Sequence, residues 1–433
     1  MQNSFKKILS ETKTGVHRLH ITKRWKAFLL IFMLLLGGMH GSTTQAHRDY
    51  VVLAETDSTS NTTTVYIPNI KRDASWNTAL WVRNNYSTAS TVDIYYYNAS
   101  GTQNSTQSYS LAANGSIPAT PPNNFTGSAK VVGTRDTSVA VLVEHTSPYS
   151  SGAYEGVEYP GIKSIVPLVH RNNSGWNNEI FLQNTSASGT ASVTVSFKAQ
   201  PGTGNNQTYS YSLAPRQTLL LNTSSSNFSG LGSVFIGSAE VTSALPVALV
   251  YNQYKNNFNS MIQASNAPYL GSDLYAPLVQ NSNNDYVAGF SAQNLTNAGS
   301  LTVTYYNGSG SSCAYSNHTG PWPLVVLPIP PAGNSCPSVA SAKFDGDDGR
   351  LMYTQINQLK TGTDQASGYA ALAHPTKLAI APRIYHNAIN YVTGIQVQNT
   401  GSDSTAVTVS YYNDSGVQQN RQTTRISSNA SIT

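Results

Sequence analysis

The amino-acid sequence predicts an all-β protein, in which tandem antiparallel β-sandwich repeats follow an N-terminal signal or anchor segment. Three observations support this prediction. A motif recurs four times at intervals of 99, 110 and 105 residues. Within each repeat apolar residues alternate with polar ones, as in strands with one buried face. Turn signals rich in Gly, Asn and Asp separate these segments at short intervals, which is typical of β-sandwich domains.

Residues 1–46 read as a secretory signal peptide or an N-terminal anchor. The apolar run Ala27–Leu36 follows several basic residues, and Thr44 and Ala46 are the small residues of a plausible cleavage site. The run is shorter than the ~20 residues needed to cross a bilayer. Both interpretations place the rest of the chain outside the cytoplasm, secreted or at the cell surface, and allow membrane contact only through an uncleaved N-terminal segment.

Composition argues against a nucleic-acid partner. Charged residues make up 10% of the chain, against ~25% in ordinary globular proteins. Seven of the 25 Lys and Arg residues and one of the 20 acids lie in residues 1–46, so the remainder carries 18 basic and 19 acidic residues. A nucleic-acid binder needs a clustered Lys and Arg surface, which this remainder lacks.

Each repeat opens with a proline, and an aromatic residue and an asparagine follow at nearly fixed spacing. The prolines are Pro68, Pro167, Pro277 and Pro382. The aromatic residues are Trp76, Trp176, Tyr286 and Tyr391. The asparagines, always eight residues further on, are Asn84, Asn184, Asn294 and Asn399. We expect these aromatic residues and asparagines to be structural, and the asparagine side chain to close a turn at the end of a strand.

Alternation places the strands inside a repeat. In the first repeat, Leu80 and Val82 share one face of a strand that ends at the asparagine, and Val92, Ile94 and Tyr96 share one face of the next. A Gly- and Asn-containing turn follows, and two more strands come later, one of them very apolar. The opening proline suits a sheet edge or a strand start, where no N–H is needed.

These spacings predict the domain boundaries. After a linker at 47–63, the complete repeats span 64–162, 163–271 and 272–377, and an incomplete fourth repeat spans 378–433. The fourth lacks the counterparts of the last strands, and half a sandwich leaves a sheet face uncovered. We therefore expect the sequence to be a fragment, or another chain to complete the fourth repeat.

Cys313 and Cys336 are the two cysteines of the chain. An even number of cysteines in an exported protein favours a disulfide, and the alternative is a pair of buried free thiols.

The repeat resembles a loosely defined class of secreted bacterial surface proteins built from ~100-residue β-sandwich units of the immunoglobulin or fibronectin-III kind. The proline, aromatic and asparagine spacings carry this resemblance over residues 65–433. The class implies an extracellular, surface-associated protein and brings no catalytic residues.

The sequence predicts no catalytic residue and no organic cofactor, because it contains no known nucleophile, metalloprotease or phosphate-loop motif. One acidic cluster, made of Asp345, Asp347 and Asp348, offers oxygen ligands for Ca²⁺ on a Gly-containing loop. A plain hairpin turn explains the same residues, because the cluster lacks the EF-hand pattern.

Four aromatic residues fall out of phase with the buried set, namely Trp81, Tyr97, Tyr306 and Tyr412. Exposed rings among Asn, Ser and Thr suit stacking against sugars, and they equally suit contacts between repeats. We therefore expect a non-enzymatic extracellular repeat protein that acts as a surface stalk, matrix or adhesion component. The alternative is a carbohydrate-binding accessory module, and the expected partners are polysaccharides or other cell-surface proteins.

Overall fold

The structure, a computed structural model, describes residues 63–133, 139–148, 150–255, 261–266, 270–295, 299–331, 335–363, 365–373, 375–388 and 391–433. All of them belong to the compact unit Val52–Thr433. The predicted signal segment 1–46 and all but the last residue of the linker lie outside the described residues. The fold is 63% strand and 3% helix, which confirms the all-β class. Among the described residues, no helix has the length and apolarity to span a membrane.

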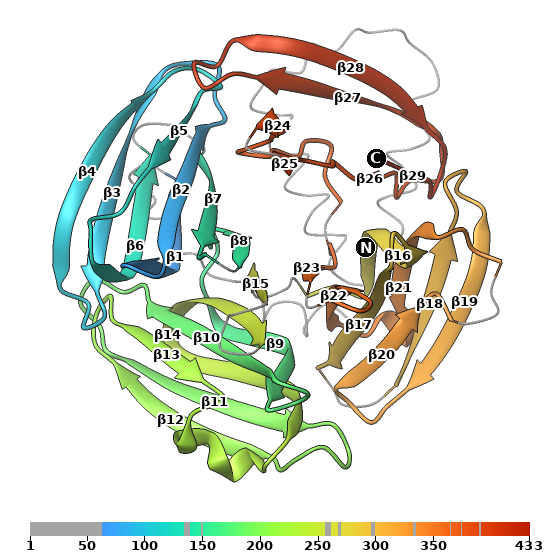
Figure 1. Ribbon diagram of the computed structural model, residues 1–433, viewed down its shortest axis with the longest axis horizontal. Coiled ribbons are helices and arrows are strands. Elements are labelled where there is room, and N and C mark those ends of the chain that lie inside the picture. The colour runs from blue at the N-terminus through green and yellow to red at the C-terminus, as the bar shows by residue number, and fades with distance from the viewer. Residues whose placement is uncertain are drawn as a thin grey trace, which may run out of the picture. The chain divides into compact units, whose positions relative to one another are not determined.

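The first repeat folds into two four-stranded antiparallel sheets (Figure 1). The first sheet has the order β1 (Thr64–Arg72), β6 (Phe125–Gly133), β3 (Ser90–Asn98) and β4 (Gln103–Leu111). The second has the order β5 (Ser116–Ala119), β2 (Asn77–Asn84), β7 (Val139–Thr146) and β8 (Ser151–Glu155). Val65, Leu80, Ile94, Val131 and Val143 come from both sheets and belong to one buried cluster. The repeat is therefore a sandwich with its core between the sheets.

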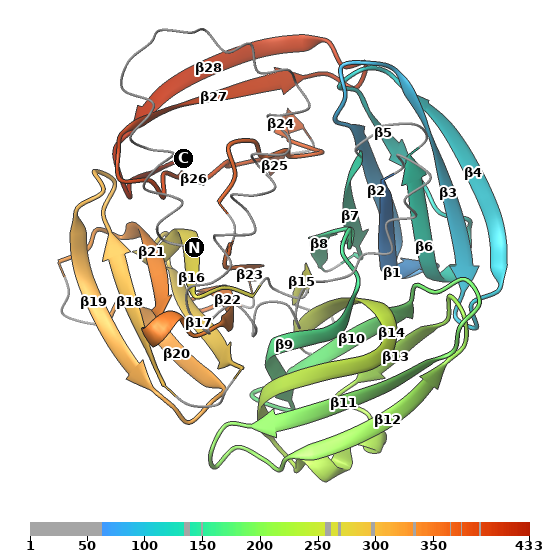
Figure 2. The same cartoon turned by 180° about the vertical axis from the view of Figure 1, so that it is seen from behind.

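The second repeat has the same strand order, but one long strand passes through both sheets (Figures 1 and 2). Its strands are β9 (Gly161–Arg171), β10 (Trp176–Asn184), β11 (Ala191–Ala199), β12 (Gln207–Leu213), β13 (Thr218–Asn222), β14 (Phe235–Lys255) and β15 (Met261–Asn266). The first half of β14 pairs with β9 and β11, and its second half pairs with β10 and β15. It thus takes the places of both β6 and β7. A short 3-10 helix, Ser226–Leu231, precedes it.

The third repeat again follows the order of the first. Its first sheet contains β16 (Asp273–Asn283), β21 (Val339–Gly346), β18 (Ser300–Tyr306) and β19 (Ser312–Thr319). Its second sheet contains β20 (Leu324–Ile329), β17 (Tyr286–Asn294), β22 (Met352–Lys360) and β23 (Ala366–Ala370). The second and third repeats each have a buried apolar cluster of their own.

Three of the opening prolines lie inside strands and not at their ends, whereas Pro382 lies before the first strand of the fourth repeat. The pairing register shifts between Ile67 and Ile70 in β1, and at the matching places in β9 and β16. Pro68, Pro167 and Pro277 fall within these irregularities. A β-bulge leaves a residue without a ladder bond, so it tolerates a proline in the middle of a strand. Of the two expected places, the strand start was wrong for these three prolines. The sheet edge was right for Pro68 and Pro167, because β1 and β9 are edge strands.

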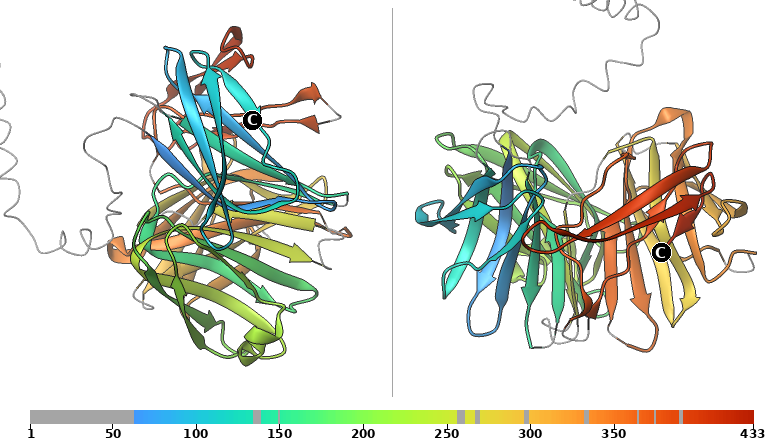
Figure 3. Two further views of the ribbon diagram at one scale, coloured as in Figure 1. Left: turned by 90° about the vertical axis from the view of Figure 1, so that its left-hand side faces the viewer. Right: turned by 90° about the horizontal axis from the view of Figure 1, so that it is seen from above.

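The fourth repeat consists of three two-stranded pieces. They are β24 (His386–Ala388) with β25 (Tyr391–Val392), β26 (Val397–Gln398) with β29 (Ser431–Ile432), and β27 (Thr405–Tyr412) with β28 (Gln418–Ile426). The long hairpin of β27 and β28 is red in Figure 3. All eight residues of β28 that precede Ile426 are exposed, so among the described residues no sheet packs over this hairpin as one does over β3 and β4.

Candidate functional site: the contacts between repeats

The recurring asparagine closes the turn that follows the second strand of the repeat. Asn184 lies at the end of β10 and is fully buried. Its Nδ2 donates hydrogen bonds to the carbonyl oxygens of Gly189 (2.8 Å), Leu213 (3.0 Å) and Ala214 (3.0 Å). Its Oδ1 accepts one from the backbone N of Ser186 at 3.0 Å. One side chain thus ties its own turn to the end of the fourth strand.

The same bonds recur in the first and fourth repeats. The Nδ2 of Asn84 donates to the carbonyl oxygens of Thr88 and Ala112, and its Oδ1 accepts from Tyr86 N. Asn399 donates in the same way to the carbonyl oxygens of Asp403, Ile426 and Ser427 and accepts from Gly401 N. Asn294 ends β17 and is fully buried. These contacts match the turn-closing role that the sequence pattern predicts.

A second recurring feature is a glycine turn that lies against the next repeat. Gly101, Gly310 and Gly416 each end the turn between the third and fourth strands, with φ of +90°, +88° and +77°. A Cβ at these positions would lie 2.2 Å from the carbonyl oxygen of Pro215, 1.9 Å from that of Ser428 and 1.8 Å from that of Ala113. Each of these oxygens belongs to the turn between the fourth and fifth strands of another repeat. Only glycine suits both the positive φ and this close approach.

A backbone hydrogen bond accompanies two of these contacts. Thr218 N, at the start of β13, donates to Ala99 O at 3.2 Å. Ser116 N, at the start of β5, donates to Asp414 O at 3.0 Å. The donors and acceptors hold matching places in their repeats. The fourth repeat therefore contacts the first through the same backbone atoms by which the first contacts the second.

The second and third repeats meet through side chains. Gly202, in the turn of the second repeat, has no atom within 4 Å of an added Cβ. Instead Ser238 Oγ donates to Gln293 Oε1 at 2.9 Å, and Tyr251 OH donates to Gln355 Oε1 at 2.7 Å. These side chains are buried. Burial on both faces explains why the run 247–250 of β14 is apolar without alternation.

Two of the tyrosines predicted to face outward are covered by arginines of a neighbouring repeat. The guanidinium carbon of Arg216 lies 5.2 Å from the ring centroid of Tyr97, and Tyr97 is only 2% exposed. The guanidinium carbon of Arg83 lies 5.0 Å from the ring centroid of Tyr412. A cation over an aromatic face is attracted by about 0.5–2 kcal/mol. The structure thus places these rings in contacts between repeats.

Trp81 joins a cluster that links the first and fourth repeats. Its Nε1 donates a 2.8 Å hydrogen bond to Glu144 Oε2, and Tyr385 OH donates to Glu144 Oε1 at 3.1 Å. The guanidinium carbon of Arg383 lies 3.3 Å from the ring centroid of Trp81 and 4.1 Å from that of Tyr385. Arg383 Nε is 3.8 Å from Glu144 Oε1. One cation therefore lies between two rings and beside a carboxylate.

The recurring aromatic residues lie beside buried or cationic groups. Trp76 is in edge contact with His145, and their ring centroids are 6.4 Å apart. Trp176 lies 6.2 Å from His170, and Tyr286 lies under the Lys360 ammonium at 5.7 Å. Tyr391 is in β25, and its side chain lies outside the described residues. These contacts agree with packing roles.

The three aspartates of the predicted calcium site do not converge. Asp345 Oδ2 accepts from Lys343 Nζ at 3.0 Å, and Asp347 and Asp348 lie in the following 3-10 turn, Asp347–Gly349. Among the residues that the structure describes, no three His, Cys, Asp or Glu side chains gather as metal ligands would. The ion pair and the turn explain the cluster, so the calcium expectation is not supported.

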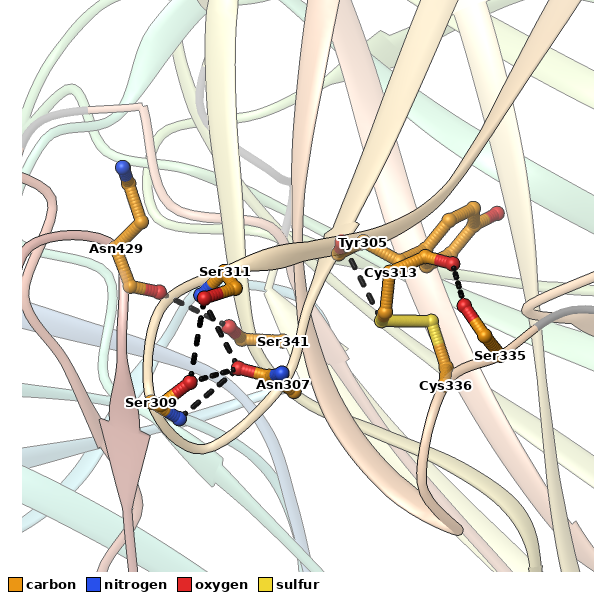
Figure 4. Close-up of a disulfide and its surroundings, with 9 residues drawn as sticks. All are labelled: Tyr305, Asn307, Ser309, Ser311, Cys313, Ser335, Cys336, Ser341 and Asn429. Carbon is orange, nitrogen blue, oxygen red and sulfur yellow. Dashed lines mark hydrogen bonds between the residues drawn. A yellow bond between two sulfur atoms is a disulfide. The ribbon is translucent and has the colours of Figure 1, made fainter.

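The disulfide between Cys313 and Cys336 is present, with 4.9 Å between the Cα atoms. It ties β19 to the loop before β21 (Figure 4). Ser335 Oγ donates to Cys313 O at 2.7 Å on the same side. Near it, Asn307 Oδ1 accepts from the backbone N of Ser309 and of Ser311, which shapes the turn that ends at Gly310. Disulfides are typical of oxidising compartments.

The outer face of the first sheet in the third repeat keeps its tyrosines at the surface. Tyr275, Lys343, Thr304 and Tyr315 are cross-strand neighbours in one row. Tyr315 is 74% exposed, and Tyr306 lies two residues further along β18 and is half-buried. Of the four predicted stacking residues, Tyr306 is thus the one that has no cation over its ring in the part of the chain that the structure describes.

Sequence reasoning missed Arg83, Arg216 and Arg383, which cover aromatic rings from other repeats. A contact between an arginine of one repeat and a ring of another is not encoded in the spacing of residues along the chain, so the sequence pattern could not predict these pairs. The glycine at the end of each turn was visible, but its contact with another repeat was not. In the comparisons with known proteins, no protein-family model and no curated protein matches the chain.

Proposed function

We propose that the chain is a non-enzymatic extracellular repeat protein that acts as a surface stalk, matrix or adhesion component. The observation that carries the proposal is the repeated joint, in which a glycine turn and a backbone hydrogen bond recur between repeats. These joints run from the first repeat to the second, from the third to the fourth and from the fourth back to the first, and buried side chains join the second to the third. The four repeats thus hold one another in place, which suits a protein that presents a fixed surface to a partner. The disulfide and the apolar segment Ala27–Leu36 support an extracytoplasmic location. The resemblance to immunoglobulin-like surface repeats is part of the same proposal.

Location and adhesion test this function. Antibodies against the purified chain should label intact cells of the natural host, and brief protease treatment of intact cells should remove the label. A deletion strain should attach less well to surfaces or to neighbouring cells, and the wild-type gene should restore attachment. Retention of the protein in the cytoplasm, or substrate turnover by the purified chain, contradicts the proposal.

A carbohydrate-binding module is the second candidate, and the exposed tyrosine row of the third repeat favours it. Tyr315, Tyr306 and Tyr275 share a sheet face with Thr304. Lys343 lies in the same row, and its charge is paired with Asp273 and Asp345. Flat rings on a polar face suit stacking against sugar rings. Binding to insoluble polysaccharide that is lost in Tyr315→Ala and kept in Tyr86→Ala, an exposed tyrosine of the first repeat, would support this candidate. Equal binding by both variants, or by neither, would remove it.

A further inference from the structure

One position on the outer face of the first sheet carries a charged residue in each of the three sandwiches. It follows the sequence Ser-Ala in the strand that pairs with both the first and the third strand of the repeat. It also lies opposite the residue two places before the opening proline. The three positions are therefore equivalent, and their surroundings can be compared directly. The charged residues are Lys130, Glu240 and Lys343.

In the second and third repeats this charge has a counter-ion. Glu240 Oε1 lies 2.8 Å from Lys163 Nζ. Lys343 Nζ lies 3.1 Å from Asp273 Oδ1 and 3.0 Å from Asp345 Oδ2. Lys163 and Asp273 hold the same place on the first strand of their repeats, so the sheet itself neutralises the charge in both cases.

In the first repeat the corresponding counter-ions are replaced by uncharged residues. Thr64 stands where Asp273 stands in the third repeat, and Val132 stands where Asp345 stands. Across the part of the chain that the structure describes, the Lys130 ammonium forms no ion pair and no hydrogen bond. It is also not one of the buried polar atoms found there, so a ligand can reach it.

A second cation reaches the same face from the second repeat. The guanidinium carbon of Arg216 lies 5.2 Å from the ring centroid of Tyr97, and Lys130 Nζ lies 5.6 Å from that of Tyr95. The two tyrosines are two residues apart on one face of β3, which is about 7 Å along a strand. Within the described ranges the Arg216 guanidinium, like Lys130, has no counter-ion and is not buried.

The two cations influence each other. Burial lowers the pKa of Lys130, and the nearby Arg216 charge lowers it further. The carboxylate of Asp93 on β3 accepts a hydrogen bond from Ser108 Oγ at 2.5 Å and pairs with neither cation. An anion bound beside Lys130 and Arg216 would relieve the repulsion between them.

Arg216 stands in a backbone conformation that suits asparagine better. Its φ is +61°, and the equivalent turn residues of the first and fourth repeats are Asn114 and Asn429, with φ of +56° and +58°. Asparagine tolerates this left-handed region more readily than arginine does. The turn alone therefore does not explain the arginine, whereas its charge beside Lys130 does.

The neighbouring strand β4 surrounds this pair with uncharged polar groups. Thr106 lies directly opposite Tyr95 in the pairing of β3 and β4. Hydroxyl and amide groups suit hydrogen bonds to sugar hydroxyls, whereas a nucleic acid needs a larger cluster of cations. The exposed residues of β4 are Gln103, Asn104, Thr106, Ser108 and Ser110.

We propose that Lys130 and Arg216 bind the carboxylates of an acidic polysaccharide across the joint between the first and second repeats. The proposal adds a ligand to the proposed extracellular function and rests on that function for the choice of a polysaccharide. Two single charges on an uncharged polar face suit a polymer with one carboxylate on each sugar ring. The hydroxyl groups of the same polymer can bond to the exposed side chains of β4.

Polygalacturonate and its methyl ester test the proposal on the purified chain, because they share a backbone and differ in charge. Calorimetric titration should give saturable binding of polygalacturonate, with the methyl ester at least 10-fold weaker. Raising the salt concentration from about 10 mM to about 150 mM shortens the screening length from about 30 Å to about 8 Å, so it should weaken the binding.

Substitutions locate the site. Lys130→Gln and Arg216→Asn should each weaken binding of polygalacturonate by about 2-fold to 10-fold, the worth of one partly exposed charged contact. Asparagine is chosen because two other repeats carry it at this turn position. Arg421→Gln is the matched control, because it removes one exposed positive charge on β28 and should leave the affinity unchanged.

Thermal unfolding curves should show that the variants remain folded. Equal binding of the methyl ester, unchanged affinity in folded Lys130→Gln, or no saturable binding of polygalacturonate would overturn the proposal. Equal affinity for a polythymidine oligonucleotide would overturn the assignment to a polysaccharide, because the site would then accept any polyanion. Labelling of intact cells tests the extracellular location separately, so a failure of this binding leaves that location standing.

Discussion

At the scale of single residues, buried asparagine side chains stabilise the turns of the repeat through hydrogen bonds to backbone atoms. Asn84 and Asn184 are both fully buried and bond only to backbone atoms. Removing such a side chain leaves several buried carbonyl groups without a donor, and this desolvation is the larger part of the loss.

Asn84→Ala should therefore lower the free energy of unfolding of the first repeat by about 1–3 kcal/mol. Urea unfolding followed by circular dichroism measures the change. Asn104→Ala is the matched control, because Asn104 is exposed on β4 of the same repeat, and surface changes usually stay within about 0.5 kcal/mol. Equal effects of the two substitutions would contradict the turn-closing role.

The buried histidines predict how stability depends on pH. Burial lowers the pKa of His145 and His170 to about 4, whereas an unfolded histidine titrates near 6.5. Between these values the unfolded chain binds more protons, so stability falls as the pH is lowered through this range and is flat above it. At pH 5 the loss is about 2 kcal/mol for each histidine.

Melting curves at pH 7 and pH 5 check this expectation. In His145→Gln the difference between the two curves should shrink, because one of the two groups no longer titrates. An unchanged pH dependence in this variant would show that other groups cause it.

At the scale of elements, the disulfide holds the edge strand β19 to the loop before β21. The cysteines are 23 positions apart, so the loop-entropy model gives a stabilisation of about 3 kcal/mol. The double substitution Cys313→Ser, Cys336→Ser should lower the free energy of unfolding of the third repeat by that amount. The unfolding transitions of the first and second repeats should stay unchanged. Reducing agent should do the same to the wild-type chain. A shift in all transitions would show that the repeats unfold together.

At the scale of the whole molecule, the joints between repeats depend on backbone contact. Gly416 and Gly202 hold matching turn positions with φ of +77° and +78°. A Cβ at Gly416 would lie 1.8 Å from Ala113 O, whereas a Cβ at Gly202 meets nothing within 4 Å. Alanine therefore strains the backbone equally at both positions and clashes only at the first.

Gly416→Ala should break the contact between the fourth and first repeats. The Ser116 amide, which donates to Asp414 O, should lose hydrogen-exchange protection, while amides in the core of β3 keep theirs. Gly202→Ala should leave Ser116 protected. Protection of Ser116 in both variants would mean that the joint does not depend on this glycine.

The sequence by itself determined the all-β class, the alternating strands along a repeat, the disulfide and the recurring asparagine. These features are local or periodic: alternation reports one buried face, and a turn needs particular residues at fixed offsets. Pro68, Pro167 and Pro277 were visible as well, but their place at a bulge depends on the neighbouring strand.

Only the tertiary structure decided what lies across the joints. Tyr97, Tyr412 and Trp81 read as exposed from alternation, yet arginines far away in sequence cover them. Gln253 of the second repeat accepts a 3.2 Å hydrogen bond from Asn357 Nδ2 of the third, a contact that neither position indicates in the sequence. Alternation records which face of a sheet a side chain is on. What meets that face depends on long-range contacts that no single-chain pattern encodes.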